Sequence, residues 1–261
     1  MLKLLLTSLY KIFTTLFFDV RQIFNKWRGI PYFFKSLREY NKKNKNINLF
    51  KVKYGQLHPV LHERYEDAGS AQGHYFFQDI WAAQYLHDNR ISEVVDVGSR
   101  IDGYIAHLLS SIKVTYIDIR SIKSFHQNFI YKEGSILDLP FKNNSVKAIS
   151  CLHVIEHIGL GRYGDKVDPY GHVKGIEELK RICAEDGKII FGTPVGNERV
   201  NFNAHRVFNP ETIINLFKPL KLEEFSLIDD KGLEIIKNPS IEQALGCNYG
   251  CGLFVFSKNE R

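Results

Sequence analysis

The stretch VVDVGSRIDG, residues Val94 to Gly103, decides the fold of this chain. Two β-branched residues lead into Asp96, Gly98 follows two positions later, and apolar residues at helical spacing begin at Tyr104. This pattern predicts a strand, a tight turn and a helix, in that order. The glycine lets a ligand approach the backbone, and the N-terminus of the helix offers free N–H groups to an anionic part of that ligand. The stretch is a candidate cofactor turn, with an ordinary connection between strand and helix as the alternative.

Strand patterns and helical patterns alternate along the rest of the chain. Strands are predicted at Val114–Ile119, Phe129–Glu133, Val146–Leu152, Lys188–Thr193, Leu222–Ile228 and Gly252–Ser257, and helices at Gly73–Asn89, Val173–Ala184 and from Pro210. This alternation predicts an α/β fold, a Rossmann-like doubly wound sheet of about seven strands that is mostly parallel. The last two strands have no clear helix between them, which predicts an antiparallel edge.

The N-terminal part is predicted to be a helical extension of the α/β domain. Residues 1–27 place apolar side chains along one helical face and basic side chains opposite, and Lys11 and Asp19 interrupt the apolar run. A bilayer-spanning helix needs about 20 apolar residues, so this segment is expected to lie in a membrane interface or to pack on protein instead. Residues 29–53 are basic and predicted to be a connecting segment. We expect residues 1–70 to form the extension and residues 71–261 the domain.

Composition narrows the classes of function. The hydrophobic fraction of 44% and the charged fraction of 25% are ordinary for a globular protein, and the net charge is +6. That charge suits an anionic substrate, a membrane surface or a nucleic acid. The basic residues between Lys35 and Lys53 lack aromatic residues at a recognisable spacing, so nucleic-acid binding is not favoured.

Cysteine and histidine spacing favours a reducing compartment and no metal. The chain has four cysteines and no disulfide framework, which favours the cytoplasm. Pro59 lies between His58 and His62, and the spacing of Cys247 and Cys251 is unlike that of a zinc knuckle.

An acidic residue ends the second predicted strand. Asp118 follows Asp96 by 22 positions. An acidic side chain about 20 residues after the first strand commonly binds the ribose hydroxyls of a nucleoside. A helix N-cap is the alternative role for Asp118.

Polar residues also follow the fourth and fifth strands. His153, Glu156 and His157 come after the fourth strand, and His205 and Arg206 come after the fifth. Because ligands bind at the carboxyl ends of the strands in such sheets, these residues are candidates for the crevice. An imidazole can accept a proton near neutral pH, and the planar fork of an arginine can bind an anionic acceptor. The long polar loop over residues 159–172, which contains Tyr163, is a candidate substrate lid.

Five segments carry a resemblance to a known family. They are VVDVGS, YIDI, GSILDLPFKNNSVKAIS, CLHVIEH and EDGKIIFGTP. Together they resemble the class I S-adenosylmethionine-dependent methyltransferases, over about Phe76 to Ser257. More narrowly, DVGSRIDG, EHIGLGRYGD and NAHRVFNP resemble a group of uncharacterised bacterial proteins with this core.

The resemblance implies S-adenosylmethionine as cofactor and a role for each candidate residue. The implied cofactor-binding residues are Asp96, Gly98 and Ser99 at the methionine end, Asp118 at the ribose, and Ser135 and Ile136 at the adenine, with Asp138 as a substitute for Ser135. The catalytic candidates are His153, His157 and His205, and the substrate-binding candidates are Glu156, Tyr163 and Arg206. The chain departs from the family at Arg100 and Asp102, which stand where glycine is common.

The expected function is methyl transfer from S-adenosylmethionine to a small polar or saccharide acceptor, with a lipid-linked glycan of polysaccharide biosynthesis as one version. A cytoplasmic enzyme, attached to the inner face of the membrane through residues 1–27, fits this expectation. The alternative is a non-catalytic membrane-associated scaffold with a degenerate cofactor crevice. A nicotinamide-dependent dehydrogenase is disfavoured because the turn lacks the full G-x-G-x-x-G pattern.

Overall fold

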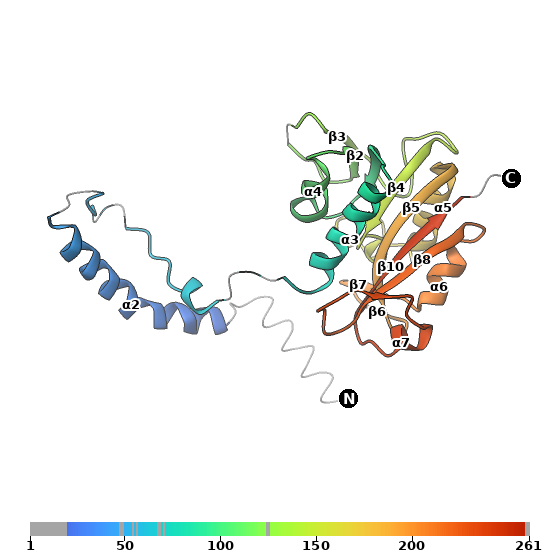
Figure 1. Cartoon of the computed structure of the whole chain (residues 1–261). Helices are drawn as coiled ribbons and strands as arrows, with labels where there is room; N and C mark the ends of the chain where they lie inside the picture. The colour runs from blue at the N-terminus through green and yellow to red at the C-terminus, as the bar shows by residue number, and fades with distance from the viewer. Residues whose placement is uncertain are drawn as a thin grey trace. The chain divides into compact units, whose positions relative to one another are not determined.

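The computed structural model describes residues 20–46, 50–53, 55, 57–66, 69, 71–123 and 126–258 (Figure 1). By its internal contacts the chain divides into two units, residues 1–70 and residues 71–261. Residues 1–19, the greater part of the predicted N-terminal amphipathic helix, lie outside the described ranges. Within those ranges no helix has the length and apolarity needed to cross a membrane.

In the first unit, helix α2 spans Val20–Asn44. The prediction of a connecting segment over residues 29–53 is therefore wrong as far as Asn44. The basic composition favoured a connecting segment, whereas the helix continues through Pro31, where one backbone hydrogen bond is lost. Good helix formers on the C-terminal side carry the helix onward, and Lys43 lies 2.7 Å from Glu39 one turn earlier. The basic composition of residues 29–44 therefore did not indicate the helix that they form.

The chain then returns alongside α2. The short 3₁₀ helix η2, Glu63–Tyr65, supplies two contacts to it. The Tyr65 hydroxyl donates to the Arg28 carbonyl oxygen over 3.1 Å, and the Arg64 guanidinium lies 3.7 Å from the centre of the Tyr32 ring. These contacts hold the first unit together locally.

The second unit is built on a mixed sheet, which in the described part of the chain has eight strands in the order β3-β2-β1-β4-β5-β10-β8-β9. The bounds are β1 Glu93–Val97, β2 Lys113–Asp118, β3 Phe129–Glu133, β4 Val146–Leu152, β5 Cys183–Val195, β8 Lys221–Ile228, β9 Ile236–Lys237 and β10 Gly250–Ser257. Strands β3, β2, β1, β4 and β5 pair in parallel, and β10 is antiparallel to both β5 and β8. The predicted doubly wound sheet with an antiparallel edge is confirmed, and the two-residue β9 is an addition. A separate hairpin pairs β6, Arg199–Asn201, with β7, His205–Val207.

Helices cover both faces of this sheet (Figure 1). On one face lie α3 (His74–Asp88), the π-helical turn η3 (Ile101–Ile105) and α4 (Ala106–Leu108), which share a core with the strands. On the other face, α5 (Gly171–Ile182), α6 (Pro210–Leu216) and α7 (Ile241–Leu245) share a second core. Strands buried on both faces need apolar residues at successive positions, and this explains the unbroken apolar runs in the sequence.

Two features of the sheet bear on the site, an early start of β5 and the connection between β2 and β3. Strand β5 begins at Cys183, five residues before the predicted start at Lys188, since Cys183 already pairs with Val146 of β4. Between Cys183 and Lys188 the pairing register shifts, and Asp186 takes a left-handed conformation at φ 59°. Between β2 and β3, the described residues of the segment 119–128 form no helix. Ile119, which directly follows β2, is accordingly 42% exposed. The carboxyl end of β2 is thus open to a ligand.

Candidate functional site

A cleft lies at the carboxyl ends of β1, β2 and β4, where the order of the strands reverses. It has a wide part of about 730 Å³ and a narrow, mostly apolar part of about 90 Å³. Both parts are lined by Gly98, Asp118, Arg120, His153, His157 and Tyr163. Pockets for small molecules usually measure about 300 to 1,000 Å³, so the wide part has the size of a small-molecule site.

The turn after β1 is held from inside the protein. Asp96 is fully buried and accepts hydrogen bonds from the Ser99 N–H (3.0 Å), the Ser99 hydroxyl (2.6 Å) and the Ser150 hydroxyl (2.6 Å). Burial raises the pKa of Asp96 to about 7, although these hydrogen bonds act in the opposite direction. Asp96 therefore lies beneath the turn and fixes its shape, whereas Gly98, at φ 71°, and Ser99 line the cleft.

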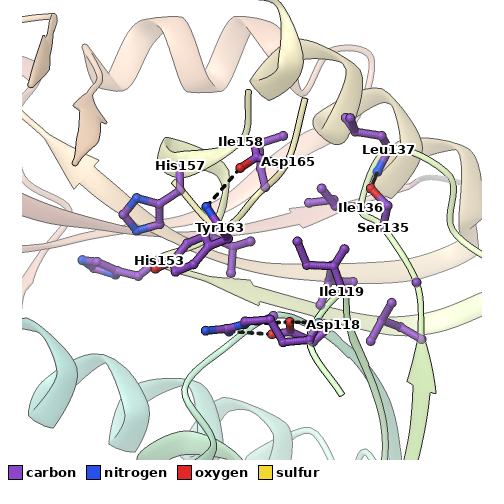
Figure 2. Close-up of a pocket in the computed structure, with 16 residues that line it drawn as sticks. Asp118, Ile119, Ser135, Ile136, Leu137, His153, His157, Ile158, Tyr163 and Asp165 are labelled. Atoms are coloured by element: carbon purple, nitrogen blue, oxygen red, sulfur yellow. Dashed lines mark hydrogen bonds and ion pairs between the residues drawn. The ribbon is translucent and has the colours of Figure 1, made fainter. Parts of the chain in front are cut away.

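Asp118 ends β2 and faces the narrow part of the cleft (Figure 2). Its Oδ1 accepts from the backbone N–H of Arg120 (2.8 Å) and from Nε of Arg120 (2.9 Å). Its Oδ2 accepts from Nη2 of Arg120 (2.7 Å) and from the Tyr116 hydroxyl (3.2 Å). Burial alone would raise the pKa of Asp118, but the hydrogen bonds from Arg120 outweigh it and lower that pKa. The side chain is thus a charged hydrogen-bond acceptor at neutral pH.

The narrow part continues from Asp118 to the loop after β3. Ile119, Ser135, Ile136 and Leu137 line it, and Figure 2 shows Ser135 to Leu137 on the side opposite the two histidines. The Ser135 hydroxyl oxygen accepts from the Leu137 N–H over 3.1 Å. Asp138 is exposed and lies outside this lining, so the structure does not bring it to the site as a substitute for Ser135. A flat apolar ring is the kind of group that such walls accommodate.

His153 follows β4 in a strained backbone conformation, at φ 55°. Its Nδ1 lies 2.6 Å from the Oε1 of Gln78 on α3. The amide oxygen can only accept, so Nδ1 carries the proton and Nε2 keeps a lone pair. Burial, together with the nearby His74, lowers the pKa of His153 well below its usual value. The ring is therefore neutral at physiological pH.

His157 and Glu156 form a buried pair behind His153. Nδ1 of His157 lies 2.6 Å from the Ala204 carbonyl oxygen, and Nε2 lies 3.6 Å from Oε1 of Glu156. Burial raises the pKa of Glu156 to about 8 and lowers that of His157 to about 4, so both groups are neutral near pH 7. Among the described residues, Oε1 of Glu156 has no hydrogen-bond partner. Glu156 accepts a hydrogen bond from the Thr193 hydroxyl and does not line the wide part of the cleft. This geometry therefore does not support the predicted contact of Glu156 with substrate.

The predicted anion-binding role of Arg206 is not supported by its surroundings. Arg206 is 6% exposed, and its guanidinium donates to the carbonyl oxygens of Ile158 (2.7 Å), Glu156 (3.4 Å) and Pro169 (3.4 Å). These bonds tie the loop after β4 to β7 and use the planar fork that a substrate would need. His205, its neighbour, lines the wide part and lies 4.8 Å from the Tyr249 ring, centre to centre.

Several residues of the cleft were missed from sequence. The most informative is Gln78, a buried residue next to His153. Its amide oxygen accepts from Nδ1 of His153 and also from the Cys251 thiol, whose sulfur is 3.7 Å away. A signal was present, since Gln78 and Asp79 interrupt an otherwise apolar helical stretch. The other missed residues line the wide part of the cleft, namely Tyr75, Arg100, Arg120, Arg162 and Tyr249.

One group of metal-ligating side chains adjoins this network. Ligand atoms of His74, His153 and Cys251 lie within 4.8 Å of one another. Gln78 already accepts hydrogen bonds from two of them, and burial raises the pKa of the Cys251 thiol well above its usual value. A buried hydrogen-bonded network accounts for their proximity. The expectation that no metal binds stays a prediction.

Comparison with known sequences gives two matches. A family model described as a Caenorhabditis protein of unknown function, DUF268, matches residues 117–238. An uncharacterized protein of Methanocaldococcus jannaschii is 26% identical over 152 residues, which are 57% of this chain and 57% of that protein. The chain thus spans little more than half the length of this relative. The narrower resemblance to bacterial proteins stays a prediction.

Comparison with solved structures is informative about the fold. A protein from Galdieria sulphuraria, assigned as a sarcosine dimethylglycine methyltransferase, has 14% identity and a TM-score of 0.52, over 69% of this chain and 85% of that one. The [4+2]-cyclase SpnF has 10% identity and a TM-score of 0.50, over 70% and 82%. The 1,6-didemethyltoxoflavin-N1-methyltransferase of Burkholderia thailandensis, with bound 1,6-didemethyltoxoflavin and S-adenosylhomocysteine, has 12% identity and a TM-score of 0.50, over 70% and 79%.

The strand order, the helices on both faces and these likenesses agree on the architecture. The second unit has the fold of the class I S-adenosylmethionine-dependent methyltransferases.

Proposed function

We propose that this chain transfers a methyl group from S-adenosylmethionine to a small polar acceptor. One observation carries the proposal, namely the order of groups along a single cleft. A glycine turn at Gly98 is followed by the ionised Asp118, and beyond Asp118 lies an apolar recess at Ile119 and Ile136. Because SpnF, a cyclase, has the same fold, the fold alone does not establish methyl transfer.

The residues present fit each part of the cofactor. Gly98 leaves room for close approach at the methionine end, since its conformation at φ 71° needs no side chain. Asp118 can accept both hydroxyl hydrogens of the ribose. The recess between Ile119 and Ile136, with Ser135 at its edge, suits the adenine ring. Ser135 and Ile136 keep their expected roles in this proposal, whereas Asp96 acts only through the turn that it holds.

The cofactor, when bound, supplies a methyl group on a positively charged sulfur. The chain has to align the acceptor, exclude water and, for a hydroxyl acceptor, take up its proton. His153 is the proposed base because its Nε2 keeps a lone pair, its low pKa holds the ring neutral and it lines both parts of the cleft. His157 has a positioning role in this scheme, since its Nδ1 is engaged with the Ala204 carbonyl oxygen.

A saccharide is the proposed acceptor. The wide part of the cleft is lined by the rings of Tyr75, Tyr163 and Tyr249 and by polar groups of His205 and Arg162. Aromatic faces with polar groups between them are suited to a ligand that has both apolar C–H surfaces and hydroxyl groups. The volume of about 730 Å³ is shared with the methionine end of the cofactor, since Gly98 and Ser99 also line the wide part.

Calorimetric titration tests the proposal. We expect S-adenosylmethionine and S-adenosylhomocysteine to bind the full chain at micromolar Kd, and Asp118→Asn to weaken both by about tenfold or more, because the ribose loses a charged acceptor. Lys113→Gln is the control. Lys113 lies at the opposite end of β2 from Asp118 and pairs there with Glu93 of β1. Absence of binding to folded protein would contradict methyl transfer and favour the scaffold alternative.

We also propose that the N-terminal segment and α2 attach the chain to an anionic membrane surface. Phe24, Trp27 and Phe34 lie on one helical face by their spacing and are 61%, 70% and 52% exposed. Lysines and arginines accompany them along the helix. Exposed aromatic and basic side chains on one helix are typical of interfacial binding.

Vesicle flotation tests this attachment. We expect the full chain to float with vesicles of phosphatidylglycerol and phosphatidylcholine, and deletion of residues 1–27 or the double change Phe24→Ser with Trp27→Ser to reduce it several-fold. Tyr170→Ser, which removes a 67% exposed aromatic residue of the second unit, is the control. Undiminished flotation of both altered chains would rule out this attachment.

A further inference from the structure

The wide part of the cleft is unusually rich in positive charge. Among the described residues that line it, three are arginines, Arg100, Arg120 and Arg162, and one is a carboxylate, Asp118. His153 and His157, which also line it, are held neutral by burial. A cavity with an excess of guanidinium groups attracts anions and binds phosphates and carboxylates through paired hydrogen bonds.

The three arginines differ in how their charge is balanced. Arg100 is paired with Asp102 through bonds of 2.6 and 3.0 Å, and Arg120 is paired with Asp118. Within the described part of the chain, no carboxylate oxygen lies within 4.0 Å of Arg162. Its Nη1 donates to the Ala204 carbonyl oxygen over 2.8 Å, which fixes the side chain in the cleft without neutralising it.

Arg120 and Arg162 lie against the same aromatic ring. The centre of the Tyr163 ring is 4.8 Å from the guanidinium carbon of Arg120 and 5.1 Å from that of Arg162. Figure 2 shows this tyrosine between the histidines and Asp118. Both guanidinium groups thus adjoin this ring, and one of them, that of Arg120, is engaged with Asp118.

The hydrogen bonds at Asp118 indicate how the Arg120 guanidinium could leave this carboxylate. A carboxylate offers about four lone-pair sites, and Asp118 already accepts four hydrogen bonds. Two come from the Arg120 guanidinium and one from the Arg120 backbone N–H. The fourth comes from the Tyr116 hydroxyl at 3.2 Å, whose one proton is shared with the Ser99 carbonyl oxygen at 2.9 Å. The Arg120 side chain is 57% exposed, so water can solvate its guanidinium when it leaves Asp118, and a ribose diol donates two hydrogen bonds. Ribose binding therefore exchanges two bonds for two and sets one guanidinium free.

We propose that the acceptor carries an oxyanion, a phosphate or carboxylate group, which Arg162 and the released Arg120 bind beside Tyr163 once the cofactor ribose has taken the place of Arg120 on Asp118. This inference rests on the proposed function and adds a substrate class and an order of binding. It also explains how a cleft whose ribose acid is occupied can bind a nucleoside.

The first test measures the exchange at Asp118. In Arg120→Gln the ribose no longer competes with a guanidinium, and we expect S-adenosylhomocysteine to bind about threefold tighter than to the unchanged chain, the size expected for a partly exposed ion pair. Lys113→Gln removes an equal charge at the far end of β2 and should leave the Kd unchanged. Unchanged or weaker binding by Arg120→Gln would overturn the exchange.

The second test measures the oxyanion site with defined probes. We expect glucose 6-phosphate or glucuronate to bind about tenfold tighter when S-adenosylhomocysteine is present, and glucose itself to bind no better with it. Arg162→Gln and Arg120→Gln should each abolish this gain, whereas Lys113→Gln should retain it. The stronger of the two probes identifies the group as phosphate or carboxylate.

The outcomes separate this inference from the proposed function. If S-adenosylhomocysteine binds and depends on Asp118 but the anionic sugars bind equally with and without it, the proposed function stands and the inference fails. If neither the unchanged chain nor Arg120→Gln binds S-adenosylhomocysteine, both fail. Binding of glucose as tight as that of its anionic derivatives would also overturn the inference.

Discussion

The turn after β1 and the turn after β4 lie side by side at the carboxyl edge of the sheet, and they differ in how completely their polar groups are bonded. After β1, the buried Asp96 accepts three hydrogen bonds from Ser99 and Ser150. After β4, His153 is strained at φ 55° and the buried Glu156 has an oxygen without a partner among the described residues. The first turn is built for stability, and the second keeps the strain and unsatisfied groups that are typical of functional sites.

The largest effect is expected from breaking the first turn. Asp96→Ala leaves two serine hydroxyls and one N–H without their acceptor in a fully buried place, and should lower the free energy of unfolding by about 3 to 5 kcal/mol. Urea denaturation measures it. A loss below about 1 kcal/mol would show that the turn does not depend on this network.

A change in the second turn, at Glu156, should raise the free energy of unfolding rather than lower it. Burial raises the pKa of Glu156 from 4.5 to about 8, so its folded state holds a proton that the unfolded chain loses above pH 4.5. The stability of the unchanged chain therefore falls as pH rises from about 5 to 8, by an amount on the order of a few kcal/mol from this group.

Glu156→Gln sharpens this expectation, because an amide imitates the protonated acid and cannot ionise. The difference in free energy of unfolding between Glu156→Gln and the unchanged chain should grow in favour of Glu156→Gln from pH 5 to pH 8. Urea titrations at three pH values measure it. A difference that stays constant with pH would mean that Glu156 is not held protonated in the folded protein.

A smaller effect is expected at Gly98. This residue lies at φ 71°, and an added Cβ would come within 3.2 Å of a Val154 methyl group. Gly98→Ala should cost about 1 to 2 kcal/mol of stability and weaken binding of S-adenosylhomocysteine, because the turn forms part of the cleft. Thermal unfolding and calorimetry check the two parts. Unaltered affinity would separate the turn from the cofactor site.

The smallest effect is expected on the surface of the same turn. Arg100 and Asp102 form an ion pair in which Asp102 is 75% exposed. Asp102→Ala should leave the free energy of unfolding unchanged within the error of a urea denaturation, because water screens an exposed ion pair. It serves as the control for Asp96→Ala, since both remove a carboxylate from this region. A large loss of stability in Asp102→Ala would mean that the loss in Asp96→Ala cannot be attributed to the buried hydrogen bonds of the turn.

The strands and the mostly parallel sheet could be predicted from sequence, because strands that are covered on both faces are rich in apolar residues. Runs such as Val94–Val97 and Val146–Leu152 are mostly apolar, and the buried exceptions, Asp96 and Ser150, bond to each other. The glycine turn and Asp118 were recognisable for a related reason, since both sit at fixed distances from such strands. The part of α2 from residue 29 to Asn44 was not recognisable, because basic residues there leave little apolar periodicity.

Partners far apart in sequence explain the rest. Arg206 was predicted to bind an anion, but the carbonyl oxygens that accept its hydrogen bonds belong to residues 37 to 50 positions earlier in the chain. Gln78 reaches His153 across 75 positions, and Arg120 occupies the carboxylate of Asp118. Each side chain was visible in the sequence, but its bonding partner was decided only by the fold.

The most direct test of the central claim is a crystal structure of the chain with S-adenosylhomocysteine bound. We predict ribose hydroxyls on Asp118, the adenine ring between Ile119 and Ile136 beside Ser135, and the Arg120 guanidinium turned away from Asp118 toward Tyr163. A nucleoside bound elsewhere on the chain, or a ribose without contact to Asp118, would contradict the assignment of this cleft as the cofactor site.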